Sequence, residues 1–237
     1  FLDYHIGVIT AAEAQCCGQL VGRPRYIDRS TPNVLQTLSK NLLVGDFGGG
    51  REKFFDPLVM ALSPPLSNGY NKGFLRQDSY LVIIMLTDSD DQSQFNTAKS
   101  TYDFLLKLKG SADRLLVGAA FVPDAEYGQC PAEGVINSTD HLPDFFKLTQ
   151  AKTFSLCSNF GKNLADLGQL VATSAQTMYL NKTPKKGTIT VSIGKDELPN
   201  DVKKGWTYNP GKNAIEFGLE IEWEKYPDNV FPEVDFE

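Results

Sequence analysis

The run Ser79 to Thr87 (SYLVIIMLT) constrains this chain more than any other feature, because it is apolar almost without interruption. A short run rich in β-branched residues predicts a strand, and the missing polar alternation predicts burial on both faces of a parallel sheet. A second run of this kind spans Leu115 to Val122. Two such strands need connecting segments that cover the sheet, so we expect a layered α/β domain.

Helical patterns alternate with the predicted strands along most of the chain. We expect helices that begin near Thr31-Pro32 and that span Arg51–Leu62, Thr97–Leu108, His141–Gln150 and Asn163–Ala175. Shorter strands are expected at Asp3–Thr10, Arg25–Asp28 and Thr153–Cys157. The alternation predicts an α/β fold with a doubly wound, mostly parallel sheet over residues 1–176.

The hydrophobic pattern changes after Gln176. The segments Thr188–Ile193 and Leu219–Trp223 alternate in polarity, and the turn Asn209-Pro210-Gly211 separates two further short segments of strand character. Hairpin-linked strands have this pattern. We therefore expect residues 177–237 to form a small antiparallel β extension that ends in an acidic tail.

Charge and cysteine content narrow the possible functions. The net charge of −6 disfavours nucleic-acid binding, because such a surface repels phosphate groups. No apolar run approaches the roughly 18 residues that span a bilayer, so we expect no transmembrane segment. The four cysteines and two histidines form no zinc-binding pattern, which leaves disulfides and free thiols as alternatives.

Carboxylates follow the most apolar strand at its expected carboxyl end, where open parallel sheets bind ligands. Asp88, Asp90 and Asp91 lie together there, and a Mg²⁺ or Ca²⁺ ion would relieve their mutual repulsion. The alternative is a solvated loop in which Asp90 or Asp91 caps the next helix. The residues alone leave both interpretations open.

These residues carry a resemblance to a known family. The segment Val82-Ile83-Ile84-Met85-Leu86-Thr87-Asp88 resembles the fourth strand of von Willebrand factor A domains, in which the aspartate belongs to a metal-ion-dependent adhesion site. Gly48-Gly49-Gly50 before a helix is similar to the family's metal-binding loop. The motifs Thr87-Asp88-Ser89-Asp90-Asp91-Gln92-Ser93 and Ser155-Leu156-Cys157 are similar to those of exported bacterial members. The likeness covers about residues 3–220 and depends on the order and spacing of these motifs.

The resemblance implies a set of site residues and a location. Asp88 and Asp90 would be metal ligands for Mg²⁺ or Ca²⁺, and the binding-loop candidates are Gly49, Gly50, Arg51, Asp91 and Ser93. Cys130 and Cys157 would form a disulfide, as suits an exported protein in the periplasm, at the outer membrane or outside the cell. Cys16 and Cys17 are candidates for a second, vicinal disulfide, with bonds to other cysteines or two free thiols as the alternatives.

Two departures from the family pattern weaken the metal site. The Asp-x-Ser-x-Ser signature of the first strand is absent, and Gly50-Arg51 stands where the family has a threonine. The first strand is central in that family, and each unpaired buried backbone group costs about 1–3 kcal/mol. We therefore expect another strand, from an upstream segment or a partner chain, between Asp3–Thr10 and Ser79–Thr87. Asp88 would bind a metal only with that strand in place.

The expected function is protein binding rather than catalysis. The first hypothesis is an exported adhesion or protein-recognition module at the cell envelope, with or without a divalent cation. The second is a structural subunit of an envelope or extracellular assembly with a vestigial metal site. A metal-dependent hydrolase using Asp88 or Asp90 is a weaker third, because the sequence has no Gly-x-Ser-x-Gly elbow and places no nucleophile beside either histidine.

Overall fold

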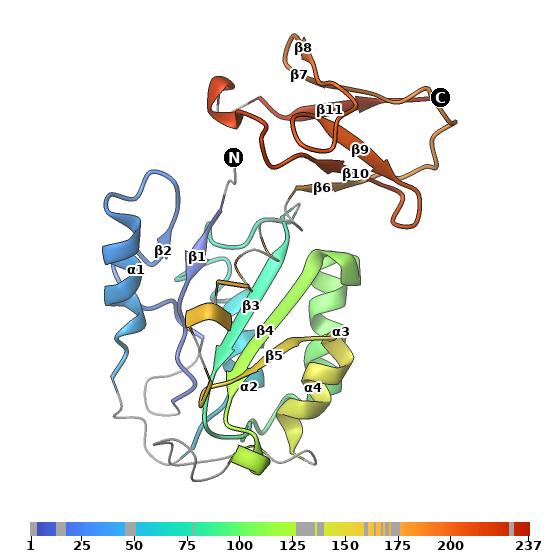
Figure 1. Cartoon of the computed structure of the whole chain (residues 1–237). Coiled ribbons are helices and arrows are strands. Elements are labelled where there is room, and N and C mark those ends of the chain that lie inside the picture. The colour runs from blue at the N-terminus through green and yellow to red at the C-terminus, as the bar shows by residue number, and fades with distance from the viewer. Residues whose placement is uncertain are drawn as a thin grey trace. The chain divides into compact units, whose positions relative to one another are not determined.

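The computed structural model divides the chain into two compact units, Asp3–Leu167 and Gly168–Glu237 (Figure 1). The structure describes residues 4–12, 18–45, 51–77, 79–126, 136, 140–158, 161–163, 165–166, 168, 171, 176–227 and 230–237. In this described part, no helix is both long enough and apolar enough to cross a membrane.

The first unit contains one parallel sheet and one short antiparallel pair. The sheet has the strand order β3 (Leu81–Leu86), β4 (Leu115–Phe121) and β5 (Lys152–Ser155). The antiparallel pair consists of β1 (Ile6–Gly7) and β2 (Tyr26–Ile27). The helices of this unit include α1 (Val34–Leu42), α2 (Phe55–Leu62), α3 (Ala98–Lys109) and α4 (His141–Thr149), and residues 161–163 and 165–166 are also helical. The 3-10 turns η2 (Ala112–Arg114) and η3 (Asp124–Glu126) flank β4.

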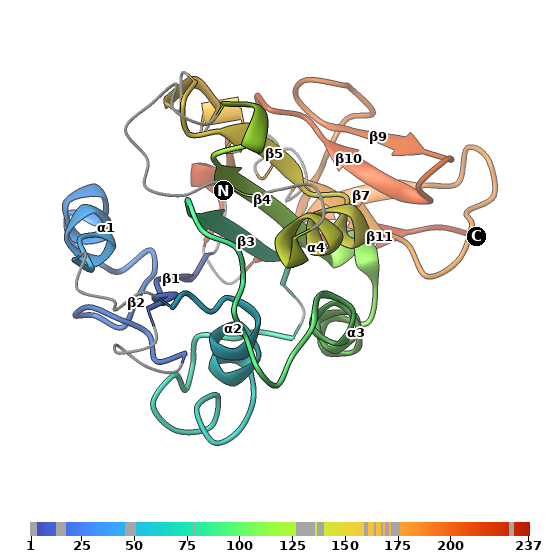
Figure 2. The ribbon, with the colours of Figure 1, turned by 90° about the horizontal axis from the view of Figure 1, so that it is seen from below.

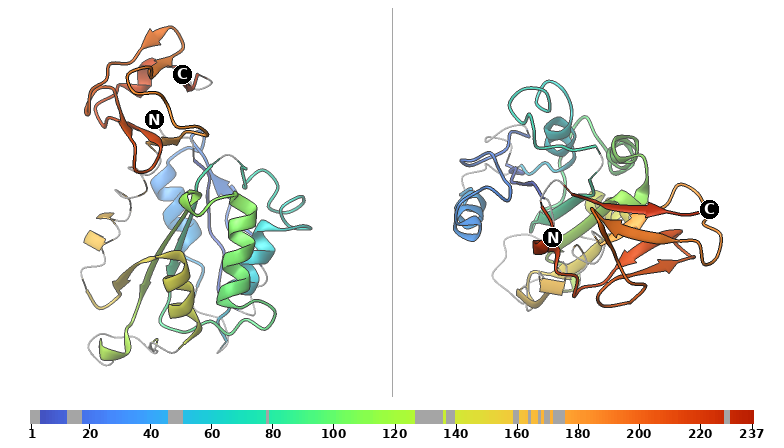
Figure 3. Two further views of the ribbon diagram at one scale, coloured as in Figure 1. Left: turned by 90° about the vertical axis from the view of Figure 1, so that its right-hand side faces the viewer. Right: turned by 90° about the horizontal axis from the view of Figure 1, so that it is seen from above.

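One face of the parallel sheet packs on three of the helices. Successive side chains of a strand point to opposite faces, and Leu81, Ile83 and Met85 of β3 all point into the main core. There they meet residues of α2, α3 and α4, among them Phe55, Leu58, Leu105, Leu142 and Phe145. Figure 2 shows these three helices on the same side of the sheet, and α3 packs beside α4 (Figures 1 and 3). The apolar spacing that predicted these helices therefore reflects a single helical layer.

The predicted doubly wound sheet of the von Willebrand factor A type is wrong. In the described part of the chain, the parallel sheet consists of β3, β4 and β5 in sequential order, and the remaining strands form three small antiparallel sheets. A doubly wound sheet reverses its strand order and carries helices on both faces, whereas α2, α3 and α4 share one face. The continuous apolar run had predicted burial of β3 on both faces, but its burial alternates between buried and partly exposed residues.

The N-terminal strand is separate from the parallel sheet. Its described ladder is limited to Ile6 and Gly7, which pair with Ile27 and Tyr26 of β2. It does not pair directly with β3, and none of the strands in the described ranges lies between them. The strand expected between these two segments thus stays a prediction.

The second unit contains two small antiparallel sheets around their own core. The first has the order β6 (Thr177–Tyr179), β10 (Ala214–Phe217), β9 (Trp206–Asn209), and the second β11 (Pro232–Asp235), β7 (Thr190–Ile193), β8 (Asp196–Glu197). The core includes Val191, Ile193, Trp206 and Ile215.

Two local expectations for this unit differ from the structure. The strand predicted at Leu219–Trp223 is wrong, because a turn and the 3-10 helix η4 (Trp223–Lys225) occupy that segment. The acidic tail instead supplies a strand, β11, which pairs with β7.

Candidate functional site at the open side of β3

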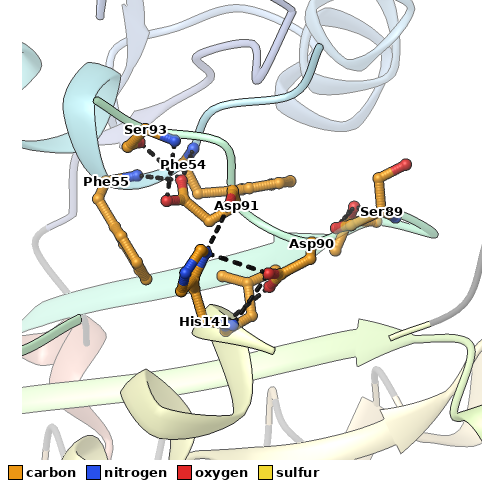
Figure 4. Close-up of polar contacts among 9 residues, drawn as sticks. Phe54, Phe55, Ser89, Asp90, Asp91, Ser93 and His141 are labelled. Atoms are coloured by element: carbon orange, nitrogen blue, oxygen red, sulfur yellow. Dashed lines mark hydrogen bonds and ion pairs between the residues drawn. The ribbon is translucent and has the colours of Figure 1, made fainter. Parts of the chain in front are cut away.

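The loop that follows β3 is fixed to the start of α2 by Asp91 (Figure 4). The Asp91 carboxylate accepts hydrogen bonds from the backbone N–H groups of Phe54, at 2.6 Å, and Phe55, at 3.0 Å. It also accepts the hydroxyl of Ser93 at 2.7 Å and the backbone N–H of Ser93 at 3.0 Å. Asp91 is only 3% exposed. Its role is therefore to satisfy the otherwise unpaired N–H groups at the beginning of α2.

Asp56, in the first turn of α2, binds back to the same loop. Its carboxylate accepts the backbone N–H groups of Gln94 at 2.8 Å, Phe95 at 3.2 Å and Asn96 at 2.9 Å. Burial raises the pKa of Asp56, but these donors outweigh it, and the net pKa lies below the usual value. Asp56 and Asp91 thus hold loop and helix together from both sides.

Asp90 caps the helix α4, although it lies far from that helix in the sequence. Its carboxylate accepts the backbone N–H groups of His141 at 2.9 Å and Leu142 at 2.8 Å. The His141 ring lies 2.9 Å from the Asp91 carbonyl and 3.3 Å from the Asp90 carboxylate. The carbonyl contact raises the pKa of His141, and the nearby Asp90, Asp91 and Asp140 charges raise it further. The expected alternative of a helix cap is therefore present, but for α4 and α2 rather than for the next helix, α3.

Glu52 completes the polar group at the carboxyl end of β3. The Thr87 hydroxyl lies 3.1 Å from its carboxylate and 2.8 Å from the carbonyl of Ser89. Burial raises the pKa of Glu52, and the Asp88 charge raises it further, while the Thr87 hydroxyl acts in the opposite direction. The Ser89 hydroxyl lies 3.5 Å from the Asp88 carboxylate.

Asp90 and Asp91, which the sequence places at the expected cation site, bind backbone donors in the structure. Both oxygens of Asp90 face backbone N–H donors, and no group of three or more His, Cys, Asp or Glu side chains suited to a metal occurs among the residues described. Arg51 is exposed, and Gly49 and Gly50 lie outside the described residues. The structure thus brings Asp90, Asp91 and Ser93 together as helix-positioning residues, and the Mg²⁺ or Ca²⁺ site stays a prediction.

In the part of the chain that the structure describes, the side of β3 that faces away from β4 is open in the sense that no strand pairs with it. The Thr87 N–H donates to the Ala120 carbonyl of β4 at 3.0 Å, so strand alternation turns the odd-numbered backbone groups toward β4. The N–H and C=O groups of Val82, Ile84 and Leu86 therefore point outward, and within the described ranges no strand pairs with them. The side chains of Ile84 and Leu86 are 48% and 47% exposed on the face opposite the helices.

Cys157 is disulfide-bonded. Its predicted partner Cys130, like Cys16 and Cys17, lies outside the described residues. The Cys130–Cys157 pairing and the vicinal pair therefore stay predictions.

Sequence reasoning missed the part that Glu52 and Asp56 play. A lone carboxylate inside the apolar run Phe54-Phe55-Asp56-Pro57-Leu58 was the available indication for Asp56, since a buried charge needs several donors. Nothing in the local sequence indicated that Ile84 and Leu86 would be half exposed, because an apolar strand looks the same with one or two covering layers.

Comparison with protein-family models and with curated proteins finds no match to this chain.

Proposed function

We propose that this chain is a protein-binding module and not an enzyme, and that it binds its partner through the open side of β3. The observation that carries the proposal is the half exposure of Ile84 and Leu86 beside the outward backbone groups of the same strand. Edge strands are usually protected by charged residues, proline or a covering segment. β3 contains only apolar residues.

The loop beyond β3 supports the proposal because it is held in a fixed conformation. Asp91 and Asp56 tie it to α2, and Asp90 ties it to α4. A surface that is ordered before binding loses less conformational entropy when a partner docks. The loop at the carboxyl end of the exposed strand is therefore ordered before a partner binds.

The partner in this proposal is a protein and the location is outside the cytoplasm, in the periplasm, at the outer membrane or outside the cell. The disulfide at Cys157 supports an oxidising compartment, where such bonds persist. The proposal needs no divalent cation, since the carboxylates of Asp90 and Asp91 are occupied by backbone donors.

A phage-displayed library of random dodecapeptides, selected against the full chain, tests this function. The strongest selected peptide is synthesised and titrated into the wild-type chain, an Ile84→Ser/Leu86→Ser variant and a Val202→Ser control. Val202 is 71% exposed in the other unit, so it matches the change in chemistry at a different surface. We expect at least about tenfold weaker binding for the β3 variant and unchanged binding for the control. A library that yields no binder, or a peptide that binds both variants equally, would contradict the proposal.

A further inference from the structure

We infer that the partner binds as an extended strand that pairs with the outer edge of β3, an inference that rests on the proposed function. The edge presents the N–H and C=O groups of Val82, Ile84 and Leu86 at alternate positions. This arrangement is complementary to the backbone of another strand and to no other regular element, because a helix satisfies its own backbone groups internally.

Continuity with the existing sheet supports this mode of binding. β3 pairs with β4 in parallel along its whole length, from Leu81–Leu115 to Leu86–Ala120. An added strand would continue the same ladder on the other side of β3. Its side chains on the face opposite the helices would then lie beside Ile84 and Leu86 and cover them.

The charge of the region indicates what the added strand carries. No lysine or arginine occurs between Arg76 and Lys99, whereas Asp78, Asp88, Asp90 and Asp91 lie in that interval. Asp91 is buried, so the acidic residues that a partner would meet at the carboxyl end of β3 are the partly exposed Asp88 and Asp90. A complementary segment is apolar at alternate positions and has a lysine or arginine at the end that lies by Asp88.

A second copy of this chain is a poorer occupant than a single segment. If the β3 strands of two copies paired edge to edge, the β4 strand of the second copy would lie next to this pair. It would then be on the side of β3 where Figures 1 and 2 both show β1 and β2. A single extended segment has no further strands attached to it. The free chain is therefore expected to sediment as a monomer, and a β3-dependent dimer would overturn the choice of occupant.

Backbone N-methylation of the selected peptide tests strand pairing directly, and it leaves the protein unaltered. Only alternate N–H groups of a paired strand face the neighbouring strand. Methylating those positions one at a time should weaken binding by at least about tenfold, whereas methylating the intervening positions should have little effect. Replacing the terminal basic residue of the peptide by glutamine should weaken binding at low salt more than at high salt.

The outcomes separate this inference from the proposed function. A peptide that loses affinity for the Ile84→Ser/Leu86→Ser variant, but shows no alternation on N-methylation, would leave protein binding in place and overturn strand addition. A peptide with the alternating pattern whose binding is unchanged by the β3 substitutions would place the strand at a different edge and overturn both.

Discussion

At the scale of single residues, the acidic loop after β3 has a structural role, because its side chains bind the beginnings of α2 and α4. Asp91 and Asp56 are 3% and 5% exposed, and each accepts several backbone N–H groups from the other's segment. A buried carboxylate persists only with such donors, because desolvation otherwise penalises its charge. Of the acidic residues that resembled a metal site, Asp90 and Asp91 thus cap the beginnings of two helices.

Replacing Asp91 by alanine should destabilise the first unit by about 2–4 kcal/mol, because the Phe54 and Phe55 N–H groups would lose their acceptor in a buried place. Chemical denaturation of the variant checks this. Asp103→Ala is the matched control, since Asp103 is half exposed and pairs with Lys99 on the surface of α3. Equal stability of the two variants would contradict the role assigned to Asp91.

Glu52→Gln should stabilise the protein at neutral pH. The pKa of Glu52 is raised in the folded chain, so folding favours its protonated form, and this preference turns into a cost as the pH rises through the folded pKa. Glutamine keeps an acceptor for the Thr87 hydroxyl without the charge beside Asp88. We expect a melting temperature about 1–3 °C higher at pH 7 and no difference below the unfolded pKa of glutamate. A lower melting temperature at pH 7 would show that the charge is favourable.

At the scale of elements, β3 is an edge strand made only of apolar residues, and such an edge favours pairing with another strand. Ile84→Lys would place a charge on its exposed face, as natural edge strands do. We expect a stability change under about 1 kcal/mol, because Ile84 is half exposed, together with at least about tenfold weaker binding of the selected peptide. Chemical denaturation and titration of the peptide into the variant measure these two effects. An unchanged affinity for the peptide would show that the exposed face of β3 does not contact the partner.

Local sequence patterns predicted the helices and strands far better than they predicted which of these elements pack or pair with one another. The runs at β3 and β4 and the stripes of α3 and α4 indicated strands and helices within a residue or two of those observed. Strand pairing depends on contacts distant in sequence, so the apolar run of β3 could not reveal that Ile84 and Leu86 would be half exposed on the face away from α2, α3 and α4. The cap of α4 shows the same limit, because α3 and β4 separate Asp90 from His141 in the sequence.

At the scale of the whole molecule, each unit has a core of its own. The core of the first unit draws on α2, α3, α4 and the parallel sheet, and the core of the second on Val191, Trp206 and Ile215. The change of pattern after Gln176 predicted an antiparallel part, whereas the fold of the first part was predicted wrongly. The reason is that alternation of strands and helices does not specify which faces the helices cover.

Ile215→Ala should destabilise the second unit by about 2–4 kcal/mol, because Ile215, on the strand β10 between β9 and β6, has a side chain that is fully buried in the core of this unit. Hydrogen exchange should show faster exchange for amides of β9 and β10 and unchanged exchange for those of β3 and β4. Loss of protection in both units would contradict the assignment of separate cores.

Amide hydrogen exchange along β3 tests the central claim most directly, because it reads the state of each backbone group. In the free chain, the amides of Ile84 and Leu86 should exchange at least about tenfold faster than those of Ile83 and Met85, which face β4. Binding of the selected peptide should then protect the fast amides. Equal protection of all four amides in the free chain would show that the outer edge of β3 is already paired, and would contradict the proposed binding site.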